Sequence, residues 1–351
     1  MSGGSGGTLA PWAAAAIACV GAGIVAEAIG LPAPWLLAGL LGGLAVAVTR
    51  GGALDVPQAP TVVSQAVVGV ALGASVAPGS LGGIAGAWPL VLALVAATLG
   101  SSVAVAFGLA RLTEIDRVTA ALGMLPGAAP ALIAVGDEVD ADARLVATMQ
   151  YGRVLLVVAT VPLLALLLGS GAAAPGPPRP EAPTGLEPGL AAAALAAAGA
   201  ALATLARAPA ASLVGPLILS AVAAATGIVP LAVPGLVADA AFVVVGASVG
   251  LRFDRESLRH AGRLAPYMAA AVLVLTVICA ALGVVLLAAL DTDSLTAYLA
   301  TTPGGISSVL AAAFDSGADL TVVVAVQTLR LMVLALAAPF AARLLRVRAA
   351  E

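Results

Sequence analysis

Long apolar stretches recur along the whole chain, separated by short polar segments and by breaks that contain Pro and Gly. A membrane-spanning helix needs about 20 residues. Ten of the stretches are close to this length, five in each half of the chain. They cover 9–29, 33–49, 62–77, 84–110 and 144–168 in the first half, and 189–206, 210–228, 236–252, 265–290 and 319–345 in the second. This pattern predicts an all-α polytopic membrane protein with ten spanning helices.

Composition strengthens this prediction and excludes several functions. Hydrophobic residues make up 62% of the chain and charged residues 9%, whereas about a quarter of a soluble domain is charged. The first apolar stretch lacks a basic region before it, so we expect a spanning helix in the plasma or inner membrane and no cleaved signal peptide. The single histidine, His260, lies in a basic loop, and no soluble stretch could fold into a nucleic-acid-binding module. We therefore expect no metal site, no cofactor, no enzyme activity and no nucleic-acid partner.

The sequence repeats itself at an offset of 177 residues. Paired positions include Asp116 and Asp293, Thr119 and Thr296, Pro126 and Pro303, Gly127 and Gly304, Gln150 and Gln327, and Arg153 and Arg330. A Pro- and Gly-rich segment separates the two copies and has too little apolar content to pack. The predicted organisation is a first membrane repeat at 1–168, a linker at 169–188 and a second membrane repeat at 189–351.

Arginines in the loops predict how the two repeats are oriented. Arg50, Arg111 and Arg117 follow the second and fourth apolar stretches of the first half, whereas the equivalent loops of the second half carry no arginine. The reverse holds for the loop at 252–263, which contains four arginines where its first-half equivalent has none. Because arginine is retained on the cytoplasmic side, the alternation predicts inverted-topology repeats with both termini in the cytoplasm. An inverted pair requires an odd number of crossings in each half.

A sixth, interrupted apolar run precedes the last helix of each half, at 117–136 and 294–314. Pro126 and Gly127 break the first run, and the sequence PGG at 303–305 breaks the second. We expect each run to be a re-entrant hairpin, because an arm of about eight residues rises only about 12 Å into a core about 30 Å thick. Non-helical backbone at that depth must face a protein-lined cavity, as in the substrate sites of inverted-repeat transporters. The alternative is a kink in an ordinary crossing helix.

Each half also places a glutamine and an arginine three residues apart on its last helix. Gln150 with Arg153, and Gln327 with Arg330, lie on one helix face near the middle of the membrane. A guanidinium suits a carboxylate, phosphate or sulfate. The alternative is that each arginine binds carbonyl groups of the hairpin or pairs with an acid (Asp137, Glu138 or Asp315), and both roles could hold together.

Two serines distinguish the second hairpin from the first. Ser307 and Ser308 follow PGG, whereas the first half has Pro130 and Ala131 at these positions, which biases a site toward the second tip. The predicted substrate-binding residues are Pro126, Gly127, Gln150, Arg153, Pro303, Gly304, Gly305, Ser307, Ser308, Gln327 and Arg330. The small residues at 69, 73, 246 and 250 are expected to allow close helix packing instead.

Several of these segments resemble a known family. GLPAPWLLAGLLGG, MLPGAAP, TTPGGISS, MQYGRVLLV and VQTLRLMVL are similar to the duplicated membrane protein family called AbrB, which also carries an ammonia monooxygenase label, and the resemblance covers residues 9–346. It implies a role in regulating gene expression, while the oxygenase label finds no cluster of metal ligands here. The predicted architecture is more loosely similar to that of the glutamate and citrate sodium symporters.

The sequence thus favours a secondary transporter of a small anionic solute, driven by Na⁺ or H⁺. The alternative is a membrane-embedded regulator of gene expression that acts through a ligand or partner, and a membrane enzyme ranks third. The expected partners are the anionic solute and the lipid bilayer, and a homodimer is one assembly left open.

Overall fold

A computed structural model describes most of the chain. The described residues are 6–29, 31, 33–50, 57–76, 86–127, 129–139, 141–167, 186–208, 210–227, 230–252 and 262–349. Every regular element among them is an α-helix, which agrees with the predicted fold class. The helices are α1 (Gly6–Ala28), α2 (Pro34–Arg50), α3 (Gln58–Ala74), α5 (Trp88–Leu112), α6 (Arg117–Met124), α7 (Ala129–Glu138), α8 (Ala143–Leu167), α9 (Leu186–Leu205), α10 (Ala211–Thr226), α11 (Gly235–Gly250), α13 (Ala265–Leu290), α14 (Ser294–Thr301), α15 (Ile306–Ser316) and α16 (Leu320–Ala349).

The helix starts follow the offset seen in the sequence. Helices α2, α3, α5, α6, α7 and α8 begin 177 residues before α10, α11, α13, α14, α15 and α16, respectively. The linker predicted at 169–188 lies almost wholly outside the described residues, and α9 begins at Leu186.

Several helices are apolar enough to lie in a membrane. Within the described residues, α5, most of α9 and α13 have the length and composition of membrane spans. Six shorter apolar helices accompany them: Ala16–Ala28, Pro34–Arg50, Gln58–Ala74, Ala211–Thr226, Gly235–Gly250 and Leu320–Leu334. Large apolar side chains such as Trp88, Leu236 and Val277 are exposed, as expected where lipid replaces water. These features indicate a multi-pass membrane protein, while the number of ten spans stays a prediction.

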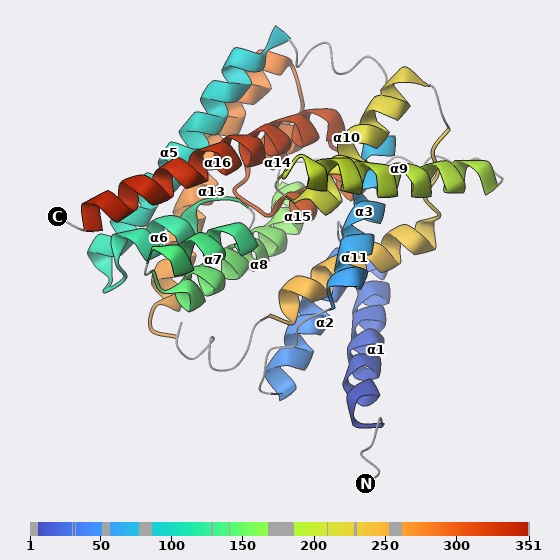
Figure 1. The fold of residues 1–351 in the computed structure, drawn as a ribbon, viewed down its shortest axis with the longest axis horizontal. Coiled ribbons are helices and arrows are strands. Elements are labelled where there is room, and N and C mark those ends of the chain that lie inside the picture. Colours follow the sequence, from blue (N-terminus) through green and yellow to red (C-terminus); the bar gives the residue numbers. More distant parts are fainter. Residues whose placement is uncertain are drawn as a thin grey trace.

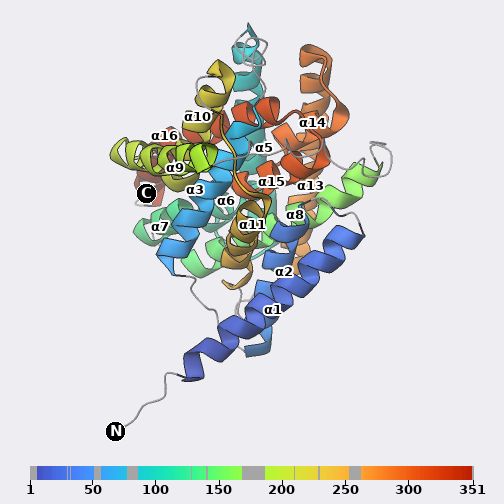
Figure 2. The same cartoon turned by 90° about the vertical axis from the view of Figure 1, so that its right-hand side faces the viewer.

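The helices gather into two groups (Figures 1 and 2). Helices α1, α2, α3, α9, α10 and α11 pack on one another, whereas α5 to α8 pack with α13, α14 and α16. Helices α5 and α13 lie side by side and run in opposite directions (Figure 1). Helix α15 contacts α3 and α11, and the ring centroids of Phe242 on α11 and Phe314 on α15 are 6.3 Å apart. The second hairpin is therefore anchored to the first helix group.

Glycines bring the backbones of α2 and α11, and of α3 and α10, into direct contact. A Cβ atom at Gly246 would collide with the carbonyl oxygen of Leu36, and one at Gly250 with that of Leu40. Gly69 and Gly73 lie in the same way against the carbonyl oxygens of Leu213 and Leu217. The structure thus confirms that these glycines serve close packing. In each pair, the residue numbers of the contacting positions rise in the same direction along both helices. The two helices of each pair therefore run parallel.

Candidate functional site

Both interrupted runs contain a real break in the helix. Helix α6 ends at Met124 and α7 begins at Ala129, while α14 ends at Thr301 and α15 begins at Ile306. Pro126 and Pro303 lie in these breaks, where their missing N–H groups leave no helical hydrogen bond unmade. A continuous helix with a kink, the alternative from the sequence, is not what the structure contains.

Each interrupted run also returns to its starting point. The hydroxyl oxygen of Thr119, at the start of α6, accepts a hydrogen bond of 3.0 Å from the backbone N–H of Asp142, which precedes α8. The hydroxyl of Thr296 accepts an equivalent bond of 2.7 Å from the N–H of Asp319. The two ends of each run therefore lie together, and the break between them forms the tip of a hairpin. We call residues 125–127 the first tip and residues 302–305 the second tip.

At the first tip, Gln150 and Arg153 of α8 bind the carbonyl groups at the end of α6. The Gln150 amide nitrogen donates to the carbonyl oxygens of Leu122 at 2.6 Å and Leu125 at 2.9 Å. Arg153 Nη1 donates to the oxygens of Met124 at 3.0 Å and Leu125 at 2.9 Å, and its Nη2 donates to Gln150 Oε1 at 2.8 Å. The last carbonyls of any helix lack partners within the helix and carry partial negative charge. This glutamine and arginine pair, hereafter the brace, satisfies them.

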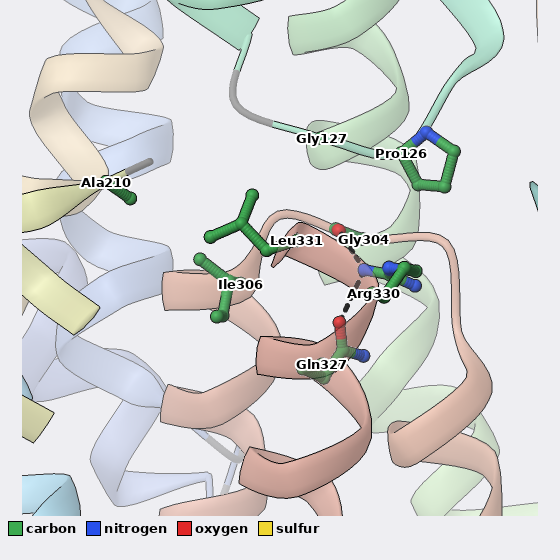
Figure 3. A pocket seen from close by; sticks show the side chains of 8 residues that line it. All are labelled: Pro126, Gly127, Ala210, Gly304, Ile306, Gln327, Arg330 and Leu331. Atoms are coloured by element: carbon green, nitrogen blue, oxygen red, sulfur yellow. Dashed lines mark hydrogen bonds between the residues drawn. The ribbon is translucent and has the colours of Figure 1, made fainter. Parts of the chain in front are cut away.

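The second tip has the same brace (Figure 3). Gln327 Nε2 donates to the carbonyl oxygens of Leu299 at 2.8 Å and Thr302 at 3.3 Å. Arg330 Nη1 donates to Thr302 O at 2.7 Å, and Nη2 donates both to Gly304 O at 3.1 Å and to Gln327 Oε1. The alternative role that the sequence left open for these arginines, binding hairpin carbonyls, is thus present in both halves. The side chains of Asp137, Glu138 and Asp315 lie outside the described part of the structure.

The two guanidinium groups are buried positive charges. Arg153 is 1% exposed and Arg330 is 4% exposed, and the two charges repel each other. Within the described residues, no carboxylate bridges to either group, and the Nε of each makes no hydrogen bond. Carbonyl dipoles compensate much of the cost of burial, which is about 2.5–3.5 kcal/mol for an arginine at mid-membrane. Each group nevertheless retains a buried N–H donor and a net positive charge.

Each tip contacts the last helix of the other half. A Cβ atom at Gly127, in the first tip, would meet the side chain of Leu334 on α16. A Cβ atom at Gly304, in the second tip, would lie 3.0 Å from the side chain of Val157 on α8. Leu334 and Val157 are themselves equivalent positions, so the two contacts are reciprocal.

A small cavity lies where the tips approach one another (Figure 3). It is lined by Pro126 and Gly127 of the first tip, Gly304 of the second tip, Ala210, and Ile306, Gln327, Arg330 and Leu331. Its volume is about 30 Å³, which holds about one or two water molecules. We refer to it as the tip cavity.

The tip cavity brings together only part of the predicted site. Among the eleven predicted residues, those lining it are Pro126, Gly127, Gly304, Gln327 and Arg330. Gln150 and Arg153 brace the first tip instead. Pro303 and Gly305 lie in the second tip, and Ser307 and Ser308 lie in the first turn of α15, but none of these four lines the cavity.

Sequence reasoning missed three lining residues, Ala210, Ile306 and Leu331. Ala210 precedes α10 with a left-handed φ of 49°, and its equivalent Ala33 has a φ of 54°. A left-handed conformation costs a residue other than glycine about 1–2 kcal/mol, so it persists only where the surroundings impose it. The signal in the sequence was the Pro-Ala pair repeated at 32–33 and 209–210.

The fold and these hairpins define the class: a multi-pass helical membrane protein with two braced helix breaks around a common cavity. Residues 35–346 match the family described as "Transition state regulatory protein AbrB", and the chain belongs to this AbrB family. It is also similar to the Escherichia coli (strain K12) protein named "Putative regulator AbrB". The two are 33% identical over 317 residues, which cover 90% of this chain and 91% of that protein.

Proposed function

We propose that the protein is a secondary transporter of a small anionic solute, coupled to Na⁺ or H⁺, with its binding site at the two tips. The observation that carries this proposal is the presence of two buried guanidinium groups beside broken helices, without a carboxylate partner in the described part of the chain. Positive charge held in this way favours a ligand that brings negative charge. In this proposal the protein is not an enzyme and needs no cofactor.

Helix α15 adds donors to the site. It begins at Ile306, which lines the tip cavity, and its N-cap residue Gly305 offers no side chain to cap the first N–H groups. The positive end of a helix and a guanidinium together form a favourable anion site. Arg330 Nε provides one further unused donor beside it.

Inverted repeats are part of the proposal, and the parallel helix pairs support them. If the two halves had the same orientation, α11 would run in the direction of α3, and α2, being parallel to α11, would run with α3 as well. The connection between α2 and α3 has only seven residues, 51–57, and spans at most about 25 Å. That is less than the about 30 Å needed to recross the apolar core, so α2 and α3 must cross in opposite directions. We therefore propose two inverted repeats, each with five spanning helices and one re-entrant hairpin.

Cysteine labelling tests this topology. With both termini in the cytoplasm, a membrane-impermeant reagent applied from outside should label cysteines placed in the 169–188 linker and should not label cysteines placed at 252–263. The matched background is Cys19→Ala with Cys279→Ala, because both native cysteines are buried. The opposite labelling pattern would refute the inverted arrangement.

The tip cavity implies that the structure represents a closed state. About 30 Å³ is too small for a carboxylate-bearing solute, so the tips must separate for binding. Their contacts with Leu334 and Val157 involve the ends of apolar side chains, which can slide without breaking hydrogen bonds. The braces would remain attached to the tips during this movement.

A regulator of gene expression is the second candidate, favoured by the names of the family and of the E. coli relative. Such a regulator would have to present an effector surface to the cytoplasm. The longest loop available for that purpose is 252–263, most of which lies outside the described residues.

Solute screening distinguishes the two candidates. Purified protein would be heated with a panel of monocarboxylates, dicarboxylates, phosphate and sulfate, because a ligand that binds only the folded state raises the apparent melting temperature. Each stabilising anion would then be tested for uptake into proteoliposomes under Na⁺ and H⁺ gradients. Gly304→Leu should abolish both responses, whereas Gly100→Leu, at a position facing open space, serves as the matched control. Stabilisation without uptake would favour the regulator, and no response to any anion would overturn the transporter.

A further inference from the structure

The two helix groups contact each other asymmetrically. In the second group, α8 packs against α2, and α15 packs against α3 and α11. Their equivalents α16 and α7 make no contact of similar extent with the first group within the described residues. The surface between the groups is therefore used on one side only, although the helices that form it occur in two equivalent copies.

A polar link at the end of α11 shows the same asymmetry. Arg252 Nη1 donates to the hydroxyl of Tyr151 on α8 at 2.5 Å, and the guanidinium carbon lies 5.2 Å from the centroid of that ring. The equivalent positions are Ser75, just after α3, and Thr328 on α16. The Ser75 hydroxyl donates to Ala71 O of its own helix at 3.0 Å, and the Thr328 hydroxyl is buried without a hydrogen bond in the described structure. The second pair of positions thus forms no link here.

The tip cavity lies on the side where the contacts are missing. Ala210 and Leu331 line it (Figure 3). Their equivalents Ala33 and Val154 are only 3% and 8% exposed, and both belong to one buried apolar cluster. One of two equivalent junctions between the helix groups is therefore packed, while a cavity separates the residues of the other.

We infer that the protein has a second state, in which α7 and α16 pack against the first helix group and Thr328 meets Ser75. Tyr151 and Arg252 separate in that state. Packed interfaces have discrete alternative arrangements, and here each contact made by one half has an equivalent ready in the other. With inverted repeats, the exchange exposes the tips to the opposite side of the membrane. The inference deepens the proposed transport function, on which it rests, because it describes the movement that carries the solute across.

The chemistry of the two links determines which state prevails. The Tyr151–Arg252 link combines a hydrogen bond from a charged donor with a cation beside an aromatic ring, whereas two small hydroxyl groups can form only a neutral hydrogen bond. The stronger link favours the state described here. Weakening it should therefore move the population toward the second state.

Cross-linking in the full-length protein tests for the second state. Ser75→Cys and Thr328→Cys are combined in the Cys19→Ala, Cys279→Ala background, and a protease site is placed in the 169–188 linker. After cleavage, the two halves separate on a denaturing gel unless the cysteine pair is joined. A short bifunctional thiol reagent applied to the protein in membranes should join them, and each single cysteine should not.

Substitutions at Arg252 test whether the two links exclude one another. Arg252→Ala should speed the joining of positions 75 and 328 at least threefold, because it removes the contact that holds the other state. Arg252→Lys keeps a cation beside the ring and should speed it less. Gly152→Ala is the matched control next to Tyr151 on α8, since the added Cβ would meet no atom within 4 Å.

Two results would overturn the inference: no joining of positions 75 and 328 in any of these proteins, or a joining rate that Arg252→Ala leaves unchanged. If Arg252→Ala does not fold, Tyr151→Phe, which removes only the hydroxyl, decides in its place. Anion uptake without any joining would refute this second state and leave the transport proposal standing. Joining that responds to Arg252→Ala, without uptake of any anion, would support the second state and count against transport alone.

Discussion

The two hairpin tips share one brace but differ in the side chains around it. Gln150 with Arg153, and Gln327 with Arg330, bind carbonyl groups at equivalent positions in the two halves. Around the second tip the chain places hydroxyl groups where the first tip has apolar residues. These positions are Thr301, Thr302, Ser307 and Ser308, against Met124, Leu125, Pro130 and Ala131.

This difference separates what the backbone needs from what a ligand would use. A broken helix exposes carbonyl groups whatever its neighbours are, so both halves require the brace. The hydroxyl of Thr302 is buried near that of Tyr298 and makes no hydrogen bond of normal geometry within the described residues, so it contributes little to the fold. Extra polar groups on one side only are expected where one tip has the larger part in binding.

Removing either arginine should cause the largest loss of stability. The loss should be similar in the two halves. Arg153→Ala and Arg330→Ala each leave several buried acceptors unpaired at about 1–3 kcal/mol apiece, so we expect each to lower the free energy of unfolding by roughly 4 kcal/mol. Unfolding in a detergent titration measures this.

Arg330→Lys separates support of the fold from ligand binding. We expect it to restore part of the stability but little anion binding, because an ammonium cannot make two parallel bonds to a carboxylate. Normal uptake by a folded Arg330→Ala protein would show that Arg330 is only a structural brace.

Replacing the packing glycines by larger residues should cause the next largest loss of stability. The loss should again be equal in the two halves. Gly69→Val and Gly246→Val force side chains against the backbone carbonyls of Leu213 and Leu36, which cannot move aside as a side chain can. We expect each to destabilise the protein by about 3 kcal/mol, with Gly100→Val, at an open position, as the control. A clear inequality between the two variants would contradict the equivalence of the two helix pairs.

Alanine in place of a tip glycine should destabilise the protein less. A second substitution, in the side chain that the new Cβ crowds, should restore part of the stability. Gly127→Ala crowds the side chain of Leu334 in the opposite half, whereas Gly304→Ala crowds Val309 of its own hairpin, 2.5 Å from the new Cβ, and Val157 of the opposite half, at 3.0 Å. Each change should cost about 1–2 kcal/mol. Leu334→Ala should relieve Gly127→Ala, and Val157→Ala should relieve part of Gly304→Ala, as measured by a double-mutant cycle. Uptake should fall further for Gly304→Ala, in the more polar tip. Additive effects within both pairs would mean that the tips do not touch the opposite half.

The smallest stability change is expected at Thr302. Thr302→Val keeps the shape and removes a buried hydroxyl that has no hydrogen bond in the described structure, so stability should rise by up to about 1 kcal/mol. Anion binding should weaken in the same variant. Leu125→Thr, at the equivalent position in the first tip, should destabilise without improving binding. A Thr302→Val protein that binds anions as the wild type does would remove the hydroxyl from the site.

Much of the architecture could be predicted from the sequence because the offset between the two repeats is constant. The offset of 177 residues located the two breaks, the two braces and the packing glycines, since each appears twice. Apolar stretches also identified the helices, although their lengths did not fix the number of spans. Helix α2 has 17 residues and rises about 26 Å, which is short of the about 30 Å apolar core.

The partners of the arginines could not be predicted, because sequence names residue types and not backbone groups. Arg330 could have paired with an acid, and only the path of the chain brings the carbonyls of Thr302 and Gly304 to it. The positions of Ile306 and Leu331 in the tip cavity, and the open space beside Gly152, depend in the same way on how helices from distant parts of the chain meet.

The glycine contacts between the halves also constrain how the protein is made. Helices α2 and α3 leave the ribosome long before α10 and α11, yet the faces that carry Gly39 and Gly43, and Gly69 and Gly73, pack on these later helices. The first half must therefore wait in the bilayer with its partner surfaces unoccupied until the second half has been inserted. Biogenesis of this protein is an assembly of two complementary pieces that are delivered one after the other on a single chain.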